Sequence, residues 1–338
     1  MTGDKMKQKR RDAQKKKQIF FLGLIVLAVA ATVAGLVING LKERSYPESY
    51  ENADSKDTIT YDGKEYEYND HLTNYLFMGI DTREPVETYE TQSDAGQADA
   101  IFLLSLDRVT QQIFCLMIPR DTMTQIEVFG PDGKSFGKSE DHINLQYAFG
   151  DGKTKSCELM EEAVSKLLYQ IPIRQYCSLN MDAIPILTDL AGGIELVVPD
   201  DSLQDVNPEF QQGAVVTITG ENAEQFVRYR DIGKTQSAIV RMNRQKVFLE
   251  AYLKKVQELS QSDTSMVTKL YEGVQDYMVT NMGTDHFVKL LEASQSGEIT
   301  VETLPGEGTQ GEYYDEYHVD DDQLYDMIIR MFYHELEQ

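Results

Sequence analysis

The stretch ADAIFLLSLDRVTQQIFCLMIPRDT, residues 98–122, holds two apolar runs with a polar interval between them. The runs are Ile101–Leu106, apolar except for one serine, and Ile113–Ile118. Short apolar runs bounded by polar residues are typical of strands buried in a sheet, and their close succession predicts a hairpin. Asp99 stands just before the first strand and Arg120 just after the second, so charged side chains mark the ends of a buried element.

The rest of the chain alternates between apolar strands and amphipathic helices. In the predicted helix Thr154–Gln170, apolar residues recur at helical spacing from Met160 to Leu168 and form one face. Further strands are expected at Tyr75–Met78, Gln175–Leu179, Ile194–Val198 and 298–304, and further helices at Asp182–Leu190, Gly220–Tyr229, Val240–Leu259, 264–279, 284–294 and 321–336. Helices that alternate with apolar strands predict a layered α/β domain.

The formal net charge of the 338-residue chain is −24, and it is unevenly distributed. Residues 1–18 contain eight lysines and arginines against two aspartates, which gives +6 and leaves −30 for the remainder. A domain of this charge repels the phosphates of nucleic acids. Non-specific binding of DNA or RNA is therefore not expected, and no nucleic-acid partner is predicted.

An uncharged apolar run, Ile19–Ile38, follows the basic stretch. At about 1.5 Å per residue a helix of this length spans roughly 30 Å, the hydrocarbon thickness of a bilayer. The basic flank predicts a single-pass anchor in the cell membrane, with a cytoplasmic N-terminus that attracts anionic lipid and an extracellular C-terminal domain. The alternative is a cleaved signal peptide, because Ala28-Val29-Ala30 is a small-x-small triplet. Either interpretation places the folded domain outside the cytoplasm.

Three cysteines, Cys115, Cys157 and Cys177, are too few and too widely spaced for a disulfide framework or a zinc site. Cys115 lies inside the second strand of the predicted hairpin. We expect free buried thiols, with a Cys157–Cys177 bridge as the alternative.

Arginines are clustered along this acidic chain. They follow the first predicted strand, follow the hairpin, and gather further on: Arg83, Arg120, Arg228, Arg230, Arg241 and Arg244. The guanidinium fork is always charged and donates paired hydrogen bonds, which suits phosphate. Arg241, Arg244 and Gln245 are spaced i, i+3, i+4 and share one helix face. For any single arginine the alternative is an ion pair with a surface carboxylate.

Two carboxylates stand at predicted strand ends, where ligands of α/β proteins bind. Asp81 follows the strand Tyr75–Met78, and Asp99 precedes the hairpin. Mg²⁺ takes oxygen ligands from one or two acids and from a bound phosphate, and arginines neutralise the remaining charge. The residues therefore predict a Mg²⁺-dependent phosphate or pyrophosphate site. Alone, each acid is an ordinary turn residue.

Seven short motifs occur in an order that is informative as a set. They are Leu76-Phe77-Met78-Gly79-Ile80-Asp81-Thr82-Arg83, Ala98-Asp99-Ala100, Met117-Ile118-Pro119-Arg120-Asp121-Thr122, Ile143-Asn144 with Tyr147, Ala191-Gly192-Gly193-Ile194, Val227-Arg228-Tyr229-Arg230, and Arg241-Met242-Asn243-Arg244-Gln245. This chain resembles the LytR–CpsA–Psr family of bacterial cell-envelope proteins. Charge and hydropathy set off a basic cytoplasmic tail (1–18), a transmembrane helix (19–38) and an extracellular linker (39–71) that ends in a short hairpin around Asp62-Gly63. The resemblance runs over a catalytic domain (72–257), and a C-terminal α/β extension packed on or following that domain occupies 258–338.

The resemblance implies an α/β/α sandwich with a mixed central sheet and an apolar tunnel for a polyprenyl chain. It implies a transferase that moves glycopolymers from a polyprenyl-pyrophosphate carrier to peptidoglycan, with a possible pyrophosphatase activity. Asp81 and Asp99 are then the Mg²⁺ ligands, and Arg120, Arg228, Arg230 and Arg241 bind pyrophosphate, with Gln245 beside them. The clustering of the arginines adds Arg83 and Arg244 to the expected pyrophosphate-binding residues. Arg120, Asp99 and Asp121 are the expected catalytic residues, with Asp121 orienting Arg120.

The chain departs from the family pattern at two positions. Gln97 stands where the family has an arginine, and Ala238 stands where it has an aspartate. The departures leave open a non-catalytic protein that binds polyprenyl pyrophosphate. A membrane-bound transcriptional attenuator is a further alternative, although residues 1–18 are too few to fold into a DNA-binding module.

Overall fold

The computed structural model describes residues 58–89, 95–130, 133–231, 234, 237–263, 265–296, 299–312 and 314–336. The expected basic tail, the expected transmembrane helix and the linker up to residue 57 lie outside these residues. Within the described part of the chain, none of the helices combines the length and the apolar composition needed to cross a bilayer.

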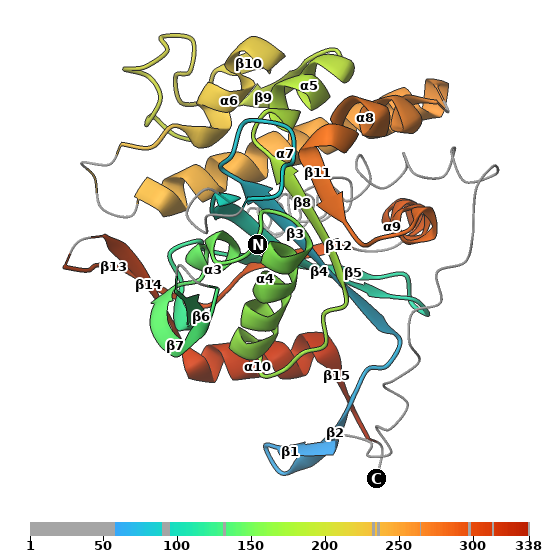
Figure 1. The fold of residues 1–338 in the computed structure, drawn as a ribbon. Helices are drawn as coiled ribbons and strands as arrows, with labels where there is room; N and C mark the ends of the chain where they lie inside the picture. Colours follow the sequence, from blue (N-terminus) through green and yellow to red (C-terminus); the bar gives the residue numbers. More distant parts are fainter. Residues whose placement is uncertain are drawn as a thin grey trace, which may run out of the picture.

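A six-stranded mixed sheet forms the centre of the domain, in the order β11-β8-β3-β4-β5-β12 (Figure 1). Its strands are β3 (Leu72–Ile80), β4 (Ala98–Asp107), β5 (Ile113–Ile118), β8 (Gln175–Asn180), β11 (Met278–Thr280) and β12 (Ile299–Thr303). The β3/β8 and β5/β12 pairs are parallel and the other pairs are antiparallel. The predicted hairpin is the β4–β5 pair, and the prediction of a mixed central sheet is confirmed.

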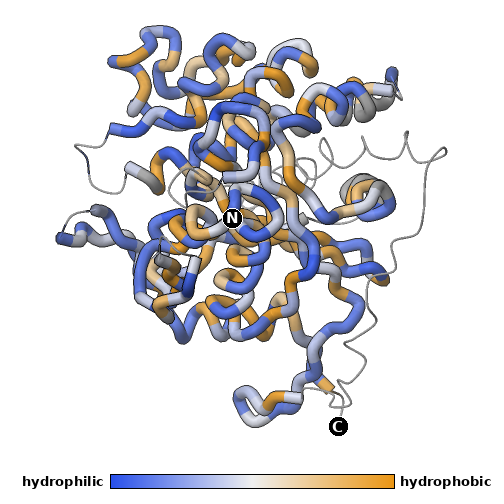
Figure 2. Tube along the Cα trace, viewed as in Figure 1, coloured by the Kyte–Doolittle hydropathy of each residue, from blue (hydrophilic) through white to orange (hydrophobic). Residues whose placement is uncertain are grey.

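Both faces of this sheet are buried under helices. Alternate residues of β3 point to opposite sides: Leu76 belongs to one apolar cluster and Phe77 to another. The first cluster includes residues of α3 (Leu145–Ala148), α4 (Thr154–Leu167) and α10 (Asp321–Phe332). The second includes residues of α9 (Thr284–Ser296) and contacts Leu249 of α7 (Ser237–Ser262). Hydrophobic residues gather along the central strands and recur along the helices (Figure 2).

A third apolar cluster joins α7 to a smaller helical region. This region contains α5 (Ala183–Leu190), α6 (Gly220–Arg228), α8 (Met266–Val274) and the ribbon of β9 (Ile194–Val197) and β10 (Val215–Ile218). Phe226 of α6 packs edge-on against Phe210 and tilted against Phe248 of α7. These contacts fix α6 and α7 relative to each other, and both helices carry arginines of the predicted site.

Three polar strand groups surround the sheet. They are β6 (Met123–Phe129) with β7 (Ser135–His142), β13 (Gly306–Gln310) with β14 (Asp315–Val319), and β1 (Thr58–Tyr61) with β2 (Lys64–Tyr68) and β15 (Tyr333–Glu335). The hairpin expected around Asp62-Gly63 is the β1–β2 turn, where both residues have positive φ. The helix expected at 321–336 instead ends at Phe332, because the following residues pair with the edge of β2 and Tyr333 packs against Tyr68.

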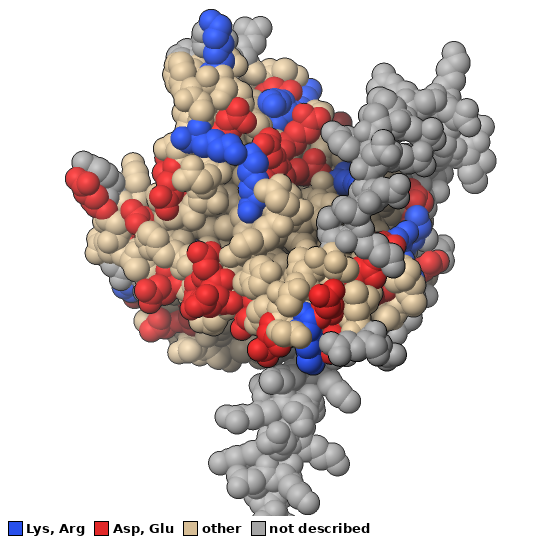
Figure 3. Space-filling model, turned by 90° about the horizontal axis from the view of Figure 1, so that it is seen from below, with Lys and Arg blue, Asp and Glu red and all other residues tan. Residues whose placement is uncertain are grey.

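The segment after residue 257 is part of the same layered structure. It contributes β11 and β12, which form the two edges of the central sheet. All three cysteines are buried and free, which confirms the expectation of free thiols. Acidic side chains predominate over basic ones on the face shown in Figure 3, in keeping with the net charge.

Candidate active site

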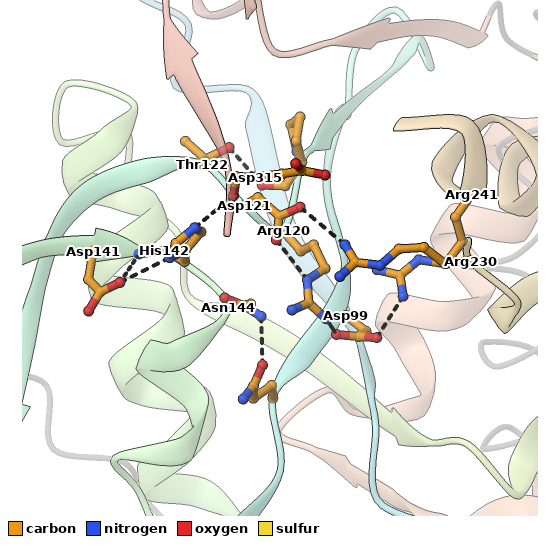
Figure 4. A network of polar contacts seen from close by, with 12 residues as sticks. Asp99, Arg120, Asp121, Thr122, Asp141, His142, Asn144, Arg230, Arg241 and Asp315 are labelled. Atoms are coloured by element: carbon orange, nitrogen blue, oxygen red, sulfur yellow. Dashed lines mark hydrogen bonds and ion pairs between the residues drawn. The ribbon is translucent and has the colours of Figure 1, made fainter. Parts of the chain in front are cut away.

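Asp99 and Arg120 meet because they lie at the same end of an antiparallel hairpin. Ile101 of β4 is paired with Ile118 of β5, so the residues just outside this pair are adjacent. Arg120 donates through Nη1 to Asp99 Oδ1. Arg241, in the first turns of α7, donates through Nη1 to Asp99 Oδ2 at 3.1 Å (Figure 4). One carboxylate with a side chain only 8% exposed therefore holds two arginines from distant parts of the chain.

Asp121 extends this network on its other side. It accepts a hydrogen bond from Arg120 Nε at 3.0 Å, and its second oxygen lies 3.9 Å from Arg230 Nη1. Burial alone would lower the pKa of Arg120, but the charges of Asp99 and Asp121 outweigh it and the pKa is raised. Burial lowers the pKa of Arg241, and Asp99 offsets part of that effect. These three arginines and two aspartates form a largely buried centre of net positive charge that is oriented before any ligand arrives.

Asp81 lies next to this centre, at the end of β3. Its Oδ1 accepts a hydrogen bond from the backbone N–H of Gln97 at 2.6 Å. Burial raises the pKa of Asp81, the Gln97 hydrogen bond opposes the rise, and the nearby charge of Asp99 adds to it. Gly96 makes the close approach possible: its φ is +79°, and a Cβ there would lie 2.8 Å from Asp81 Oδ1.

The side chain of Gln97 has a structural contact of its own. Its Oε1 accepts a hydrogen bond from Asn144 Nδ2 at 2.9 Å, while the backbone N–H of Asn144 donates to the carbonyl of Arg120 at 3.3 Å. Gln97, which replaces the arginine of the family pattern, therefore joins the loop of Asp81 to the loop of Arg120 through an amide pair.

The donor set at this centre limits the kind of cation that could bind. Among the described residues, no group of three histidines, cysteines or acids could hold a metal ion. Asp81 and Asp99 are near enough for one charge to raise the pKa of the other, and a cation between them would relieve that repulsion. Such a pair fits Mg²⁺ bound together with a phosphate ligand, since Mg²⁺ commonly takes one or two carboxylates and completes its shell with phosphate and water.

The remaining predicted residues form two further groups. Arg83 and Arg228 both bind Glu224 of α6 rather than Asp99. Arg244 is buried and donates to Ser202 Oγ at 3.1 Å and to the carbonyl of Tyr229. Gln245 donates through Nε2 to the carbonyl of Val227 at 3.2 Å, which ties α7 to the end of α6.

An apolar cavity begins at Asp99 and Gln245 and extends between the sheet and α5 and α7. Its empty volume, including the open mouth, is about 1020 Å³. The walls come from β3, β4, β8, α5 and α7, and include Phe77, Phe102, Leu179, Leu187, Phe248 and Tyr252. A charged centre at one end of an apolar cavity suits an amphiphile with an anionic head and a hydrocarbon tail.

The LytR_cpsA_psr family model matches residues 38–331, which is most of the chain. The chain belongs to the LytR–CpsA–Psr family. Motifs carrying Asp81, Asp99, Arg120, Arg228 and Arg241 all lie inside the matched region. The resemblance found in the sequence is thereby confirmed.

Relatives of this LytR–CpsA–Psr protein include curated enzymes and solved structures. The polyisoprenyl-teichoic acid–peptidoglycan teichoic acid transferase TagU of Halalkalibacterium halodurans is 26% identical over 304 residues, covering 87% of this chain and 90% of TagU. The crystal structure of B. subtilis TagV aligns with a TM-score of 0.58 and 24% identity over 77% of this chain and 96% of TagV. TagT bound to LIIa-WTA aligns with a TM-score of 0.55 and 20% identity over 78% of this chain and 90% of TagT. The two structural likenesses show a shared fold.

Sequence reasoning did not identify three residues that shape this LytR–CpsA–Psr site. Gly96 carried a signal, since a glycine beside two acids at a strand end suggests a close backbone approach. Asn144 was visible only as part of a motif. Glu224 gave no signal, because its importance comes from two arginines that are distant from each other in sequence.

Proposed function

We propose that this protein transfers a glycopolymer from a polyprenyl-pyrophosphate carrier to peptidoglycan on the outer side of the cell membrane. The observation that carries the proposal is that Asp99, which holds Arg120 and Arg241, lies in the wall of the apolar cavity. A prenyl chain in the cavity would place its diphosphate at the arginines. The names of the TagU and TagV relatives, which are teichoic acid transferases, support a polymer of that general class.

The chemistry asked of the protein is phosphoryl transfer. A sugar hydroxyl of peptidoglycan attacks the phosphorus that bears the glycopolymer, and the bond from that phosphorus to the bridging oxygen breaks. Polyprenyl monophosphate leaves with the bridging oxygen, and the hydroxyl proton passes to water. Such reactions depend chiefly on positioning and charge stabilisation. Ion pairs with Asp99 orient Arg120 and Arg241 so that they can stabilise such charge. Asp121 fixes the direction of Arg120 by accepting a hydrogen bond from Arg120 Nε.

We further propose a Mg²⁺ dependence, with Asp81 and Asp99 as the protein ligands. Bound there, the cation would supply Lewis-acid stabilisation of the diphosphate charge. Burial and the nearby charge of the buried Asp99 both raise the pKa of Asp81, which supports this assignment. The test with a readout other than turnover is Mn²⁺ binding followed by electron paramagnetic resonance in the presence of pyrophosphate. Loss of the bound signal in Asp81→Asn is expected, and an unchanged signal would contradict the assignment.

The location of the reaction follows from the N-terminal sequence. The apolar run Ile19–Ile38 after a basic stretch supports a single-pass anchor with the catalytic domain outside the cell. That side of the membrane is where peptidoglycan and lipid-linked polymers meet.

Turnover by the full chain in nanodiscs tests the function. A polyprenyl-pyrophosphate-linked saccharide, Mg²⁺ and purified peptidoglycan are supplied, and polyprenyl monophosphate and saccharide bound to peptidoglycan are measured. We expect Arg120→Ala to reduce both products about 100- to 1000-fold, as for loss of one preorganised donor.

The matched control is Arg108→Ala. Arg108 lies beyond the opposite end of β4, roughly 30 Å from Asp99 at about 3.3 Å per residue, and binds the backbone carbonyls of Asp70 and His71. It should keep wild-type turnover. Tight lipid binding by the wild type without either product would contradict the proposal and leave a non-catalytic lipid-binding protein.

A further inference from the structure

The arginines near the site fall into two groups that differ in exposure. The side chains of Arg120 and Arg241 are 21% and 6% exposed and are fixed on Asp99. Those of Arg83 and Arg228 are 52% and 42% exposed and share a different carboxylate, Glu224. The inner group is desolvated and oriented in advance. The outer group is held by ion pairs that remain in contact with solvent.

Glu224 binds its two arginines in a geometry that resembles phosphate recognition. Arg83 donates with Nη1 to Oε2 at 3.0 Å and with Nη2 to Oε1. Arg228, one turn further along α6, donates with Nη1 to the same Oε1 at 2.9 Å. Two oxygens facing a guanidinium fork are also what a phosphate group offers to arginine. The carboxylate therefore fills a place that a substrate phosphate could take.

This outer group is attached to residues that line the apolar cavity. Val227, which precedes Arg228, and Met181 line the cavity. The backbone N–H of Met181 donates to the carbonyl of Thr82 at 2.9 Å, so the loop that carries Arg83 is attached to the cavity wall. Asp182 Oδ1 lies 3.6 Å from Arg83 Nη1, so Arg83 has a second carboxylate partner besides Glu224.

We propose that Glu224 is a specificity-determining residue that makes the site prefer a diphosphate to a monophosphate. The proposal rests on the proposed function. Glu224 competes with the ligand for Arg83 and Arg228, and a ligand must carry enough charge to displace it. Exposed ion pairs are weak, so a diphosphate that already contacts Arg120 and Arg241 can release the outer arginines from Glu224. A monophosphate, which is the leaving product of the transfer, competes poorly, and Glu224 recaptures the arginines.

The test compares two probes, farnesyl pyrophosphate and farnesyl monophosphate, by calorimetric titration of the full chain in detergent micelles. Wild type should bind the diphosphate more tightly. Glu224→Gln should bind both probes more tightly, the monophosphate most, so that the ratio of the two Kd values falls about three- to tenfold. Glu221→Gln is the matched control, because it removes the same charge from an exposed position on the same helix.

A second variant shows whether the gain depends on the released arginine. Adding Arg83→Ala to Glu224→Gln should return the monophosphate Kd to the wild-type range. An unchanged or weaker affinity in Glu224→Gln would overturn the inference, as would an equal gain in Glu221→Gln, which would indicate long-range charge alone. Thermal unfolding of each variant confirms that it is folded.

Arg120→Ala separates the failure of this inference from failure of the proposed function. If Arg120→Ala abolishes binding of both probes while Glu224→Gln changes nothing, the proposed site stands and the role of Glu224 is rejected. If Arg120→Ala binds both probes as wild type does, or if wild type binds neither, the proposed site fails and the inference fails with it.

Discussion

Asp99 is the residue on which the charged centre depends. Its carboxylate faces Arg120 on one oxygen and Arg241 on the other, and all three side chains are largely buried. Removing the negative charge leaves two buried cations side by side. We expect Asp99→Asn to lower the free energy of unfolding by about 3–5 kcal/mol, the range for breaking a buried ion pair from one side. Urea unfolding measures this.

The control for that prediction is Asp182→Asn. Asp182 also faces an arginine, but its side chain is 38% exposed. We expect a change within about 0.5 kcal/mol, as for ordinary surface substitutions. Equal effects of the two variants would show that Asp99 is not a special structural counter-ion.

Glu161 on α4 gives a prediction that depends on pH. Burial raises its pKa to about 7, with the charge of Glu158 as the second cause, and its Oε1 has no hydrogen-bond partner among the described residues. The pKa of an unfolded glutamate is about 4.3, so the folded state binds the proton more tightly. Stability is therefore lost as pH rises from about 4.3 to about 7, and the loss is complete above that range.

Glu161→Gln removes this ionisation. The free energy of unfolding should rise by about 1–3 kcal/mol at pH 8 and change little at pH 4.5. Denaturant unfolding at the two pH values measures the difference. Glu162→Gln, an exposed neighbour paired with Lys166, is the control and should show no such pH dependence. A gain of equal size at both pH values would contradict the assignment.

At the scale of elements, the site depends on where strands and helices end. The hairpin β4–β5 was predictable, because its apolar runs are bounded by polar residues, and it delivers Asp99 and Arg120 to one edge. The position of Arg241 beside Asp99 was not predictable to the same degree. It depends on how α7 lies across the sheet, and that is decided by long-range contacts of Phe248 and Leu249 with two separate clusters.

The ribbons β6–β7 and β13–β14 were not predicted, whereas the β1–β2 hairpin was. Strand β7 is almost wholly exposed, so its sequence has no apolar alternation to detect. It is held instead by pairing with β6. Strand β14 is attached to the site by backbone contacts. The backbone N–H of Tyr317 donates to the carbonyl of Asp121 at 2.8 Å, and Tyr317 also forms an isolated β-bridge with Thr122. Such contacts depend on the tertiary fold and leave no local pattern.

The apolar cavity makes a prediction about α5. Leu187 lines the cavity, whereas Leu190 on the same helix is 37% exposed and is not part of its wall. Leu187→Trp should fill the cavity and weaken binding of a long-chain polyprenyl pyrophosphate at least about tenfold, while binding of inorganic pyrophosphate is kept. Calorimetric titration with both ligands measures this.

Leu190→Trp is the matched control, and it should bind both ligands as wild type does. Equal loss of long-chain and inorganic pyrophosphate binding in Leu187→Trp would contradict the cavity as the place of the lipid chain. It would indicate instead that α5 supports the charged centre.

At the scale of the whole molecule, the central sheet needs the end of the chain. Both of its edge strands, β11 and β12, come from after residue 257, and α10 covers one of its faces. A chain that stops at residue 257 would expose the open edges of β8 and β5. We expect this fragment to aggregate or to unfold without a cooperative transition by circular dichroism. A soluble, cooperatively folding fragment would show that the C-terminal segment is an accessory.

The sequence was sufficient for the mixed α/β fold class, and it placed Asp99, Arg120 and Arg241 in ordered motifs near element ends, which the structure brings together. The sequence was insufficient to predict which partner each arginine binds. Arg83, Arg228 and Arg244 have the same chemistry as Arg120, and only their partners, Glu224 in one group and Ser202 with Tyr229 in the other, separate them. Those partners are set by packing over long sequence distances.

The most direct test of the account is a crystal structure of this protein with a polyprenyl pyrophosphate bound. We predict that the diphosphate contacts Arg120 and Arg241 beside Asp99, and that the prenyl chain lies in the cavity between β3, β4, α5 and α7. A prenyl chain bound elsewhere, with the cavity empty and the diphosphate away from Arg120, would contradict the proposed site and the transfer reaction built on it.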